Sequence, residues 1–276
     1  MENNWSKDKA GIIVKDLNDT ISYPETLNDF CFAVEDSSDW FQFRNELIHH
    51  YVKKWLQDGD FLDIGGGNGF QAKALSDLKI INGDIILIEP GYIGCLNAKK
   101  RDCKFIYCGF FQDLDFNKQH NITMCGLFDV IEHVEDDIIF LNQLYSKLPI
   151  NSRVFINVPA KSSLWSQTDV YAGHYRRYDE SDIERIQQNT QFKVIDSSFY
   201  FDFYILPLIL FRVIPEKLGF IKTEKQIIAS EKRNLTATNK SVLNIFFRYI
   251  HKLKLRKLEN GYKIKNGTSL FIVLKK

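Results

Sequence analysis

Residues 61–70, FLDIGGGNGF, lead an apolar strand that ends in an acid into a glycine-rich turn and then a helix. Glycine allows backbone angles and a close ligand approach that a Cβ atom would forbid, and the first helical turn offers unpaired N–H groups to an anionic group. A second apolar strand, DIILIEP, ends at Glu89 about twenty residues beyond Gly69, where a carboxylate can accept hydrogen bonds from both hydroxyls of a ribose. The two strands together predict a nucleoside-binding site.

The residues around the glycines distinguish between nucleoside cofactors. A dinucleotide fingerprint needs a glycine at position 70, which is Phe70, and usually an apolar residue where Asp63 stands. The segment instead resembles the first two motifs of the class I S-adenosylmethionine-dependent methyltransferases, (apolar)-Leu-Asp-(apolar)-Gly-x-Gly-x-Gly followed by a ribose acid. The cofactor contacts that this resemblance implies are Asp63, Gly65, Gly66, Gly67, Gly69 and Glu89. A glycine-rich turn without a ligand is the alternative interpretation.

Length and composition indicate one α/β domain. A chain of 276 residues with 45% hydrophobic content can bury a full core. Its five cysteines include no CxxC pair, so neither a disulfide framework nor a zinc ribbon is indicated and a reducing cytoplasm fits best. The first residues, MENNWSKDKAG, lack the apolar stretch of a signal peptide, which agrees with a cytoplasmic location.

The net charge of +1 hides an uneven distribution. Residues 221–276 carry 14 Lys and Arg against three acids, a net +11, whereas residues 1–220 carry 22 against 32, a net −10. A basic tail of this kind predicts an anionic partner. No nucleic-acid motif is present, so an anionic membrane surface or a phosphorylated substrate is favoured over nucleic acid.

Apolar runs alternate with helical patterns through most of the chain. Strands are expected at 60–64, 84–88, 104–108, 122–129, 153–158, 192–200 and 268–276, and helices at about 69–78, 93–101, 135–147 and 179–189. This alternation predicts a doubly wound, Rossmann-like α/β sheet with helices on both faces. The family resemblance implies a seven-stranded sheet, mostly parallel, with the last strand antiparallel.

We expect a single methyltransferase domain over residues 1–276. Its cofactor-binding core, 59–200, follows an N-terminal helical segment, 1–58, that carries an apolar stripe leading into the first core strand. An insertion at 201–267 is too long for a hairpin loop and is expected to form a helical cap before the final strand, 268–276.

The strand at 122–129 ends in Asp129 at the sheet edge where ligands bind in open α/β folds. The following DVIEHV segment resembles the DVLEHV segment of one large methyltransferase group, and Asp129 and His133 are expected to line the floor of the site. Glu132 beside His133 suggests a metal site, but the acids there also begin a helix, where negative charge is favourable. No second histidine at a ligand spacing supports a metal, so none is expected.

The segment CGFFQDLDF, residues 108–116, stands where the family usually carries an acid for the adenine amine. Phe111 is expected to stack on the adenine and Gln112 to supply a polar contact. Burial of Phe110 and Phe111 in the core is the alternative.

The most distinctive segment is KSSLWSQTDVYAGHYRRYDESDI, residues 161–183. Together with the preceding NVPA it resembles a methyltransferase subgroup with the motif VPA…LW…D…GHxRRY, described mainly as predicted enzymes of glycan or lipid-linked metabolism. Trp40, Phe41 and Arg44 match the entry segment of the same subgroup.

Methyl transfer to a hydroxyl needs an aligned acceptor and a base for its proton. Histidine is the side chain whose unperturbed pKa suits a base near neutrality, so His174 is the candidate base. The other side chains expected to contact the acceptor are His133, Tyr171, Tyr175, Arg176, Arg177 and Tyr178. The tyrosines would wall the pocket and the arginines would hold a phosphate or carboxylate. A solvated cluster of ion pairs is the alternative.

Two features of the insertion suggest a lipid-like partner. FYILPLILF, residues 203–211, is too short to span a bilayer but long enough to enter one leaflet. Between residues 243 and 257, an apolar stripe (Leu243, Phe246, Ile250 and Leu253) lies beside five cations, as in an interfacial basic helix. A cap that buries its apolar face against the domain explains the same pattern.

The sequence therefore predicts an S-adenosylmethionine-dependent O-methyltransferase for a small-molecule, sugar or lipid-linked acceptor. It is expected in the cytoplasm, with peripheral contact to the inner face of the membrane. Two alternatives remain open at this point: a soluble small-molecule methyltransferase without membrane contact, and a non-catalytic S-adenosylmethionine-binding module.

Overall fold

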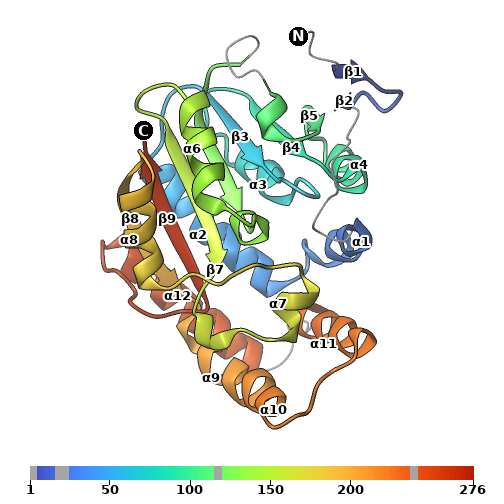
Figure 1. Ribbon diagram of the computed structural model, residues 1–276, viewed down its shortest axis with the longest axis vertical. Coiled ribbons are helices and arrows are strands. Elements are labelled where there is room, and N and C mark those ends of the chain that lie inside the picture. The colour runs from blue at the N-terminus through green and yellow to red at the C-terminus, as the bar shows by residue number, and fades with distance from the viewer. Residues whose placement is uncertain (1–4, 16–24, 115–119, 237–241) are drawn as a thin grey trace.

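A nine-stranded sheet forms the centre of the computed structural model, which describes residues 5–15, 25–114, 120–236 and 242–276 (Figure 1). The strands lie in the order β1-β2-β5-β4-β3-β6-β7-β9-β8. Their bounds are β1 Trp5–Lys7, β2 Ile13–Lys15, β3 Asp60–Ile64, β4 Ile85–Glu89, β5 Phe105–Cys108, β6 Ile122–Phe128, β7 Arg153–Pro159, β8 Lys193–Tyr200 and β9 Ser269–Lys275. The chain runs from β3 to β4 and β5 on one side and then returns to β6 on the other, so β3 lies at a switch point, where open α/β sheets bind ligands.

The directions of the strands agree with the α/β Rossmann-like expectation. Strands β3 to β7 pair in parallel, whereas β9 pairs antiparallel with both β7 and β8. The expected number of seven strands is wrong, because β1 and β2 add a hairpin to the outer edge of β5.

This added hairpin has a local cause that a strand pattern does not reveal. Its two strands have three residues each, too few for a visible alternation, and its turn depends on Gly11 at φ 83° and on the Asp8 side chain, which accepts from the Ile12 N–H at 2.8 Å. Trp5 then packs edge-on against Tyr107 of β5, with ring centroids 5.5 Å apart. Tertiary packing therefore creates these strands.

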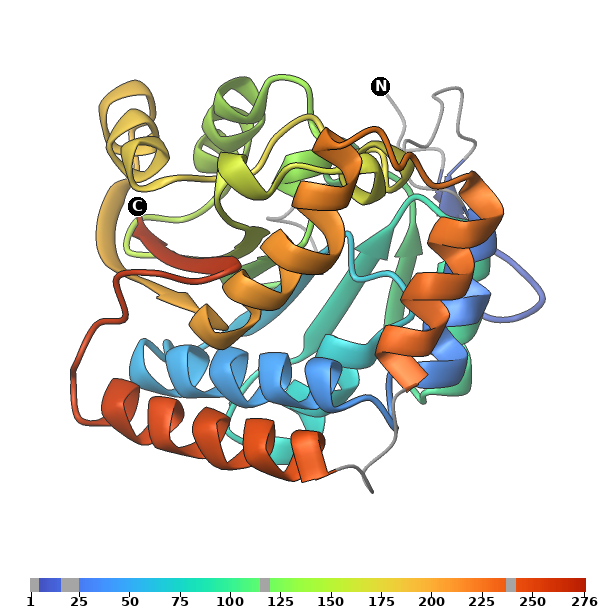
Figure 2. The ribbon, with the colours of Figure 1, turned by 90° about the horizontal axis from the view of Figure 1, so that it is seen from below.

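Helices cover both faces of the sheet. In Figure 2, α6 and α8 lie on one face, and α2 and α12 run side by side across the other. The helices of the core and the N-terminal segment are α1 Glu25–Val34, α2 Asp39–Lys54, α3 Phe70–Leu78, α4 Tyr92–Lys100, α6 Asp137–Lys147, α7 Gln167–Tyr171 and α8 Glu180–Asn189. Helix α6 begins two residues later than expected because Asp136 caps it, accepting from the Ile139 N–H at 2.9 Å.

Alternate residues of the strands supply two hydrophobic layers. On β3, Phe61 packs with Leu47 and Tyr51 of α2, while its neighbour Leu62 packs with Leu141 of α6. Burial of both faces explains why the central strands read as continuous apolar runs. It also holds the carboxyl ends of β3, β4 and β6 rigidly at one edge of the sheet.

The insertion is helical, but it does not form one unit. Its helices are α9 Ile205–Leu208, a π-helical turn Ile209–Val213, α10 Ile214–Lys217, α11 Glu224–Thr236 and α12 Val242–Glu259. Helices α9 to α11 lie beyond the carboxyl ends of the strands, near α7 (Figures 1 and 2). Helix α12 instead packs along α2, where the His251 imidazole stacks on Phe43 at 4.1 Å and pairs with Glu46 at 3.0 Å.

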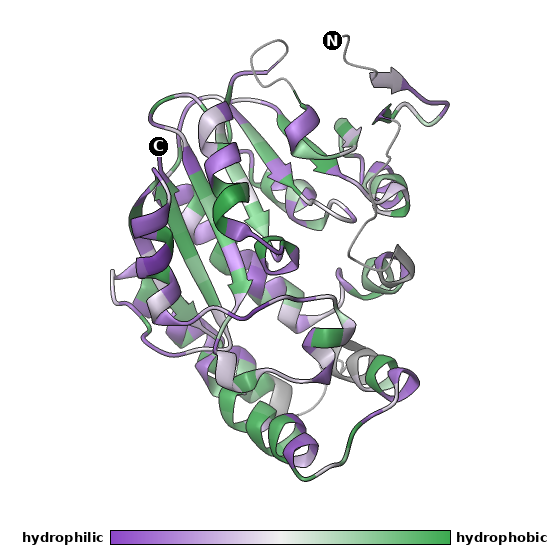
Figure 3. Ribbon diagram, in the orientation of Figure 1, coloured by the Kyte–Doolittle hydropathy of each residue, from purple (hydrophilic) through white to green (hydrophobic). Residues whose placement is uncertain are grey.

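Apolar side chains remain exposed on the insertion. Figure 3 shows hydrophobic residues gathered on α9, α10 and the turn between them. No helix in the described part of the chain is long and apolar enough to cross a membrane. Of the stripe expected on residues 243–257, the Leu243 side chain falls outside what the structure describes. Phe246 and Leu253 are exposed, and Ile250 is partly exposed.

Two glycines of the turn allow the cost of overpacking to be separated from the cost of backbone strain. Gly69 (φ 74°) faces Ala98 and Cys103, so an added Cβ would lie 2.8 Å from Cβ and Sγ of these residues. We expect Gly69→Ala to lower the free energy of unfolding by about 2–5 kcal/mol, because left-handed strain of about 1–2 kcal/mol adds to overpacking of about 1–3 kcal/mol. Urea denaturation measures this loss.

Gly67→Ala is the control. Gly67 is also left-handed, with φ 50°, but an added Cβ would meet nothing within 4 Å. We expect this variant to lose only the strain, about 1–2 kcal/mol. Equal losses in the two variants would contradict the packing described here.

Candidate functional site

The glycine-rich turn between β3 and α3 is held to the neighbouring strand by backbone hydrogen bonds. Gly65, Gly67 and Gly69 all have positive φ, at 66°, 50° and 74°. The Gly65 N–H donates to the Ile88 carbonyl at 2.8 Å, and the Gly69 N–H donates to the Gly66 carbonyl at 2.9 Å. These bonds curl the backbone around an open space above Gly67.

Glu89 lies at the end of β4 and closes this curl. Its Oε2 accepts from the Gly67 N–H at 3.0 Å, and its Oε1 accepts from the Gly91 N–H at 2.7 Å. A carboxylate has about four acceptor positions, so one group can hold backbone N–H groups and ribose hydroxyls together. The two backbone bonds fix the orientation of the carboxylate at the switch point of the sheet.

Asp63 lies beneath the turn and is almost fully buried. Its Oδ2 has no hydrogen-bond partner, and burial, together with the charge of Glu89, raises the pKa of this carboxyl to about 7 despite the opposing charge of Arg44. A buried acceptor with unused capacity beside an open glycine cradle suits a polar cofactor. The turn, Glu89 and Asp63 therefore fit the nucleoside cofactor that the sequence predicts.

Helix α1 covers the turn from outside. Asn68 donates to the Asn28 carbonyl at 2.9 Å and to the Glu35 carboxylate at 3.2 Å, and Arg101 pairs with Glu35 at 3.0 Å. Sequence reasoning missed these polar residues, because they become buried and paired only when α1 and α4 pack together.

Phe111 and Gln112, which are expected to contact adenine, differ in their burial. Phe111 is 2% exposed and packs edge-on against Phe140, with ring centroids 4.6 Å apart, so its ring is a core residue here. Gln112 is exposed and points toward Gln143 of α6, at 3.4 Å. The core alternative holds for Phe111 because the short helix at Phe111–Asp113 turns its ring inward.

Asp129 stands at the carboxyl end of β6 with φ 60°, in a network of buried polar groups. Its carboxylate accepts from the Arg44 guanidinium and from Asn157 Nδ2, the latter at 2.7 Å. The Tyr200 hydroxyl donates to Asn157 Oδ1. Arg44 reaches this site from α2 and lies 5.0 Å from the Trp40 ring centre, which gives the WF-and-Arg44 motif a structural role at the floor of the site.

His174 lies in the loop after α7 and is hydrogen-bonded to a buried acid, Asp169. His174 Nδ1 lies 3.1 Å from Asp169 Oδ1, and Asp169 also accepts from Arg177 Nε at 2.8 Å and from the Ser166 N–H at 2.9 Å. Hydrogen bonds from His174 and the charge of Arg177 hold the pKa of Asp169 below its usual value despite burial. The acid is therefore ionised and can only accept, so His174 Nδ1 is the donor of this hydrogen bond.

Three of the residues expected to hold the acceptor are bonded to carboxylates of the protein itself. Arg176 pairs with Asp137 at 2.8 Å, and Arg177 is committed to Asp169. Tyr178 is fully buried and its hydroxyl donates to Asp137 at 2.8 Å. Both arginines form ion pairs, as the alternative interpretation has it, but their partners are the buried carboxylates of Asp137 on α6 and Asp169 on α7 and not a solvated cluster.

Two tyrosines of the segment remain accessible. Tyr175 is 51% exposed and Tyr171 is partly exposed. The backbone of Tyr175 is fixed, since its N–H donates to the Glu132 carbonyl at 2.7 Å. This bond ties the GHYRRY loop to the turn that follows β6.

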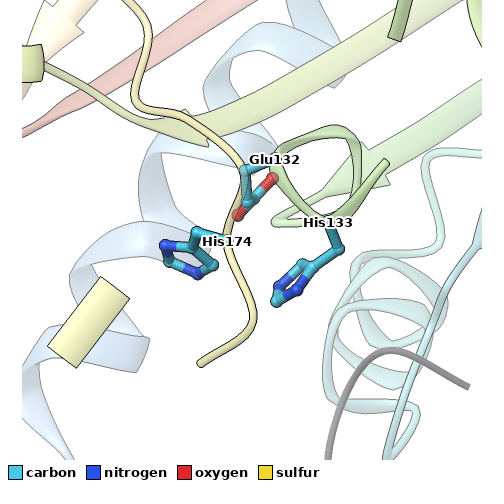
Figure 4. A group of neighbouring side chains, drawn as sticks. All are labelled: Glu132, His133 and His174. Carbon is cyan, nitrogen blue, oxygen red and sulfur yellow. The ribbon is translucent and has the colours of Figure 1, made fainter. Parts of the chain in front are cut away.

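The same bond brings two histidines together. His133 packs edge-on to His174, with ring centroids 4.8 Å apart (Figure 4). Burial, and next the charge of His174, lower the pKa of His133 to about 4, so this ring is neutral. Glu132 lies beside them, 0% exposed, and burial raises its pKa well above the usual value. The expectation of no metal rested on the lack of a second histidine, which the fold supplies.

Asp169 and Asn157 were absent from the expected site. The only sequence signal for Asp169 was the single D in the motif LW…D…GHxRRY, and Asn157 follows the apolar run of β7 without a motif of its own. Both act through other side chains, His174 and Asp129, so only the folded geometry reveals them.

Comparison with protein families identifies the chain's class. A family model described as a methyltransferase domain matches residues 38–197, more than half of the chain. The chain belongs to this methyltransferase family. A search of curated proteins gives no match.

Solved structures share the fold. Phosphoethanolamine N-methyltransferase 2 of Haemonchus contortus, in complex with S-adenosyl-L-methionine, aligns with a TM-score of 0.54 and 18% identity, over 94% of this chain and 58% of that one. The plantazolicin methyltransferase BamL, in complex with a triazolic desmethylPZN analog and S-adenosylhomocysteine (SAH), aligns with a TM-score of 0.54 and 13% identity, over 92% of each chain.

A third neighbour is a Thermotoga maritima S-adenosylmethionine-dependent methyltransferase, described as a possible histamine N-methyltransferase. It aligns with a TM-score of 0.52 and 14% identity, over 91% of this chain and 95% of that one. This chain thus spans little more than half of the Haemonchus protein but nearly all of the other two. At these identities the likeness shows the fold, and the two complexes agree with S-adenosylmethionine as the expected cofactor.

The raised pKa of Asp63 predicts a pH dependence of stability. The folded protein keeps this proton up to about pH 7, whereas the unfolded chain releases it near 3.8. The contribution of the protonated carboxyl is therefore fully present below the unfolded pKa and is lost as the pH rises through the folded pKa. Asp63→Asn, which stays neutral, should gain about 1–3 kcal/mol relative to wild type between pH 5 and pH 8.

Urea denaturation of both proteins at pH 5, 6.5 and 8 measures this gain. Asp58→Asn, at an exposed site just before β3, is the control and should run parallel to wild type. A stability difference between Asp63→Asn and wild type that does not change with pH would show that Asp63 titrates normally.

Proposed function

We propose that this protein is an S-adenosylmethionine-dependent methyltransferase that methylates a hydroxyl of a sugar or lipid-linked acceptor. The observation that carries the proposal is the joint geometry of the left-handed glycine turn and Glu89, whose carboxylate is fixed across the turn by the Gly67 and Gly91 N–H groups. Family membership supports the reaction class.

The cofactor would be held by residues of β3, β4 and the turns that follow them. Glu89 would accept from the ribose hydroxyls, and the backbone of Gly65 to Gly69 would meet the methionine part, where side chains are excluded. When bound, S-adenosylmethionine supplies a methyl group on a positively charged sulfur. The protein's task is then to align an acceptor and remove its proton.

His174 is the residue proposed for the proton. Asp169 holds its Nδ1–H, so Nε2 would accept the proton of an acceptor hydroxyl as the oxygen gains the methyl group. The side chain is 16% exposed, which lets the proton pass on to solvent. A side chain oriented by a buried carboxylate favours an enzyme over a non-catalytic cofactor-binding module.

The exposed apolar surface of the insertion supports a lipid-linked acceptor. The large apolar side chains left exposed on α9, α10 and the segments around them are Leu206, Leu210, Phe211, Ile214, Leu218, Phe220 and Ile221. Phe211 is the most exposed of these side chains, at 75%. Contiguous exposed apolar residues mark an interaction site. Because this surface lies near α7 at the carboxyl edge of the sheet, a membrane docked there would present lipid-linked molecules to the site.

Lysine side chains lie close in sequence to the exposed apolar residues. Lys217 and Lys225 are exposed and Lys222 is partly exposed. Lys217 lies among the apolar residues along the chain, and Lys222 and Lys225 follow them. On α12, by contrast, Lys254 pairs with Asp202 at 2.5 Å. The proposed partner is therefore an anionic bilayer that meets the surface of α9 to α11, with the enzyme bound peripherally.

Cofactor binding is the first test of this function. Isothermal calorimetry should show binding of SAH and none of NAD. Glu89→Ala should weaken SAH binding by about 1–3 kcal/mol, because the ribose loses its acceptor. Glu184→Ala, an exposed acid of α8, is the control and should bind SAH as wild type does. Binding of NAD but not of SAH would overturn the assignment.

The second test concerns His174. His174→Ala should lower turnover about 10²–10⁴-fold while SAH binding survives, because only the base is lost. Methyl transfer from radiolabelled S-adenosylmethionine to a panel of free and lipid-linked sugars measures turnover. His50→Ala, a partly buried histidine of α2, is the control. Unchanged turnover in His174→Ala would make this histidine structural.

The third test concerns the membrane. Binding to anionic vesicles should weaken as salt shortens the Debye length from about 10 Å at 0.1 M to about 3 Å at 1 M. Replacing Lys217, Lys222 and Lys225 with Gln should remove up to about 3 kcal/mol of binding. The same change at Lys79, Lys104 and Lys193 is the control, with equal loss of charge elsewhere on the surface. If the intact protein binds no vesicles, a soluble small-molecule acceptor replaces the lipid-linked one.

A further inference from the structure

Three side chains that are far apart in the sequence converge beside the proposed acceptor site. Glu132 and His133 belong to the short helix after β6, Ile131–His133, and His174 belongs to the loop after α7. One donor atom from each lies within 4.8 Å of the other two. Figure 4 shows the three side chains gathered around one space.

The carboxylate of Glu132 has no hydrogen-bond partner among the residues that the structure describes. The residue is 0% exposed, and both of its carboxylate oxygens are buried and unbonded. The nearest charges do not satisfy it, since Arg44 is bound to Asp129 and Arg177 to Asp169. Buried carboxylates are normally paired or bind a metal ion. Since the neighbouring cations are paired with other acids, a bound metal ion would supply the partner that Glu132 lacks.

Both imidazoles are oriented as metal ligands usually are. A ligating histidine normally uses its second nitrogen in a hydrogen bond to a carboxylate or a backbone carbonyl. His174 has this bond to Asp169, at 3.1 Å, and His133 is hydrogen-bonded to the Gly173 backbone. The outer partners are thus in place, one on α7 and one in the loop that carries His174.

We infer that Glu132, His133 and His174 bind a divalent transition-metal ion of the zinc type. Two histidines and one glutamate form a ligand set that suits such ions better than Mg²⁺, and three protein ligands leave a fourth position open for substrate. Tetrahedral ligands of one ion lie about 3.4 Å apart, so side-chain movements of about 1 Å would close the set.

This inference deepens the proposed function and rests on it for its chemical role. An acceptor hydroxyl at the open position would lose its proton to water more readily, because the ion stabilises the negative oxygen. That oxygen would form the new bond to the methyl carbon as the bond from sulfur to methyl breaks, and the sulfur leaves as a neutral thioether. His174 would then act as a ligand in the metal-loaded enzyme, and as the base only without metal.

Metal titration of the full chain tests the site directly. Protein stripped with a chelator is titrated with Co²⁺, and its visible absorption is followed, with Zn²⁺ competition as a second readout. We expect one equivalent to bind and Zn²⁺ to displace it. Glu132→Gln, which keeps the shape of the buried group, and His133→Asn should each weaken binding at least about 10-fold. His50→Asn, outside the cluster, should bind as wild type does.

Failure of the site and failure of the proposed function are separable, because SAH calorimetry is run on the same samples. SAH binding without Co²⁺ binding, or Co²⁺ binding that is equal in Glu132→Gln and wild type, would overturn the metal site and leave the function. Co²⁺ binding that is lost in Glu132→Gln would support the site, whether or not SAH binds. If His133→Asn fails to fold, the comparison of Glu132→Gln with wild type alone decides.

Discussion

The bond from the Gly67 N–H to the Glu89 carboxylate is the interaction on which the cofactor side of the site depends. It joins the turn after β3 to the end of β4 at 3.0 Å, and it exists only because Gly67 adopts a left-handed backbone. The turn in turn needs β3 and β4 paired in register, with Asp63 opposite Leu87. A two-sided core supplies that register, so the hydrophobic layers on both faces of the sheet position a few polar atoms at its edge.

The acceptor side is built differently, from loops held by buried charge. The Asp169 carboxylate accepts from the Ser166 N–H and from His174 and pairs with Arg177. The Asp137 carboxylate accepts from Tyr178 and pairs with Arg176 and Arg185. Breaking such a buried pair leaves a charge without compensation, which is costly, and the loop is therefore rigid without regular structure of its own. This rigidity aims His174 at His133 and Glu132. The GHYRRY segment is conspicuous in the sequence because most of its residues serve this framework.

The sequence predicts the core strands and helices to within two residues, because apolar runs buried on both faces and a glycine turn leave local signals. It does not predict what depends on distant partners. The hairpin of β1 and β2 forms only against β5. The arginines of the GHYRRY segment were expected to bind substrate because their actual partners, Asp137 and Asp169, cannot be recognised from the sequence. The meeting of His133 with His174, 41 residues apart, follows from the loop's return over the end of β6.

The central claim is that the glycine turn and Glu89 hold the nucleoside of S-adenosylmethionine. A crystal structure of the protein with bound SAH tests it most directly. The account predicts ribose hydroxyls at about 2.5–3.0 Å from the Glu89 carboxylate, with the amino-acid end of the ligand over the backbone of Gly65 to Gly69. A ligand bound away from this turn, or a ribose whose hydroxyls do not reach Glu89, would contradict the account.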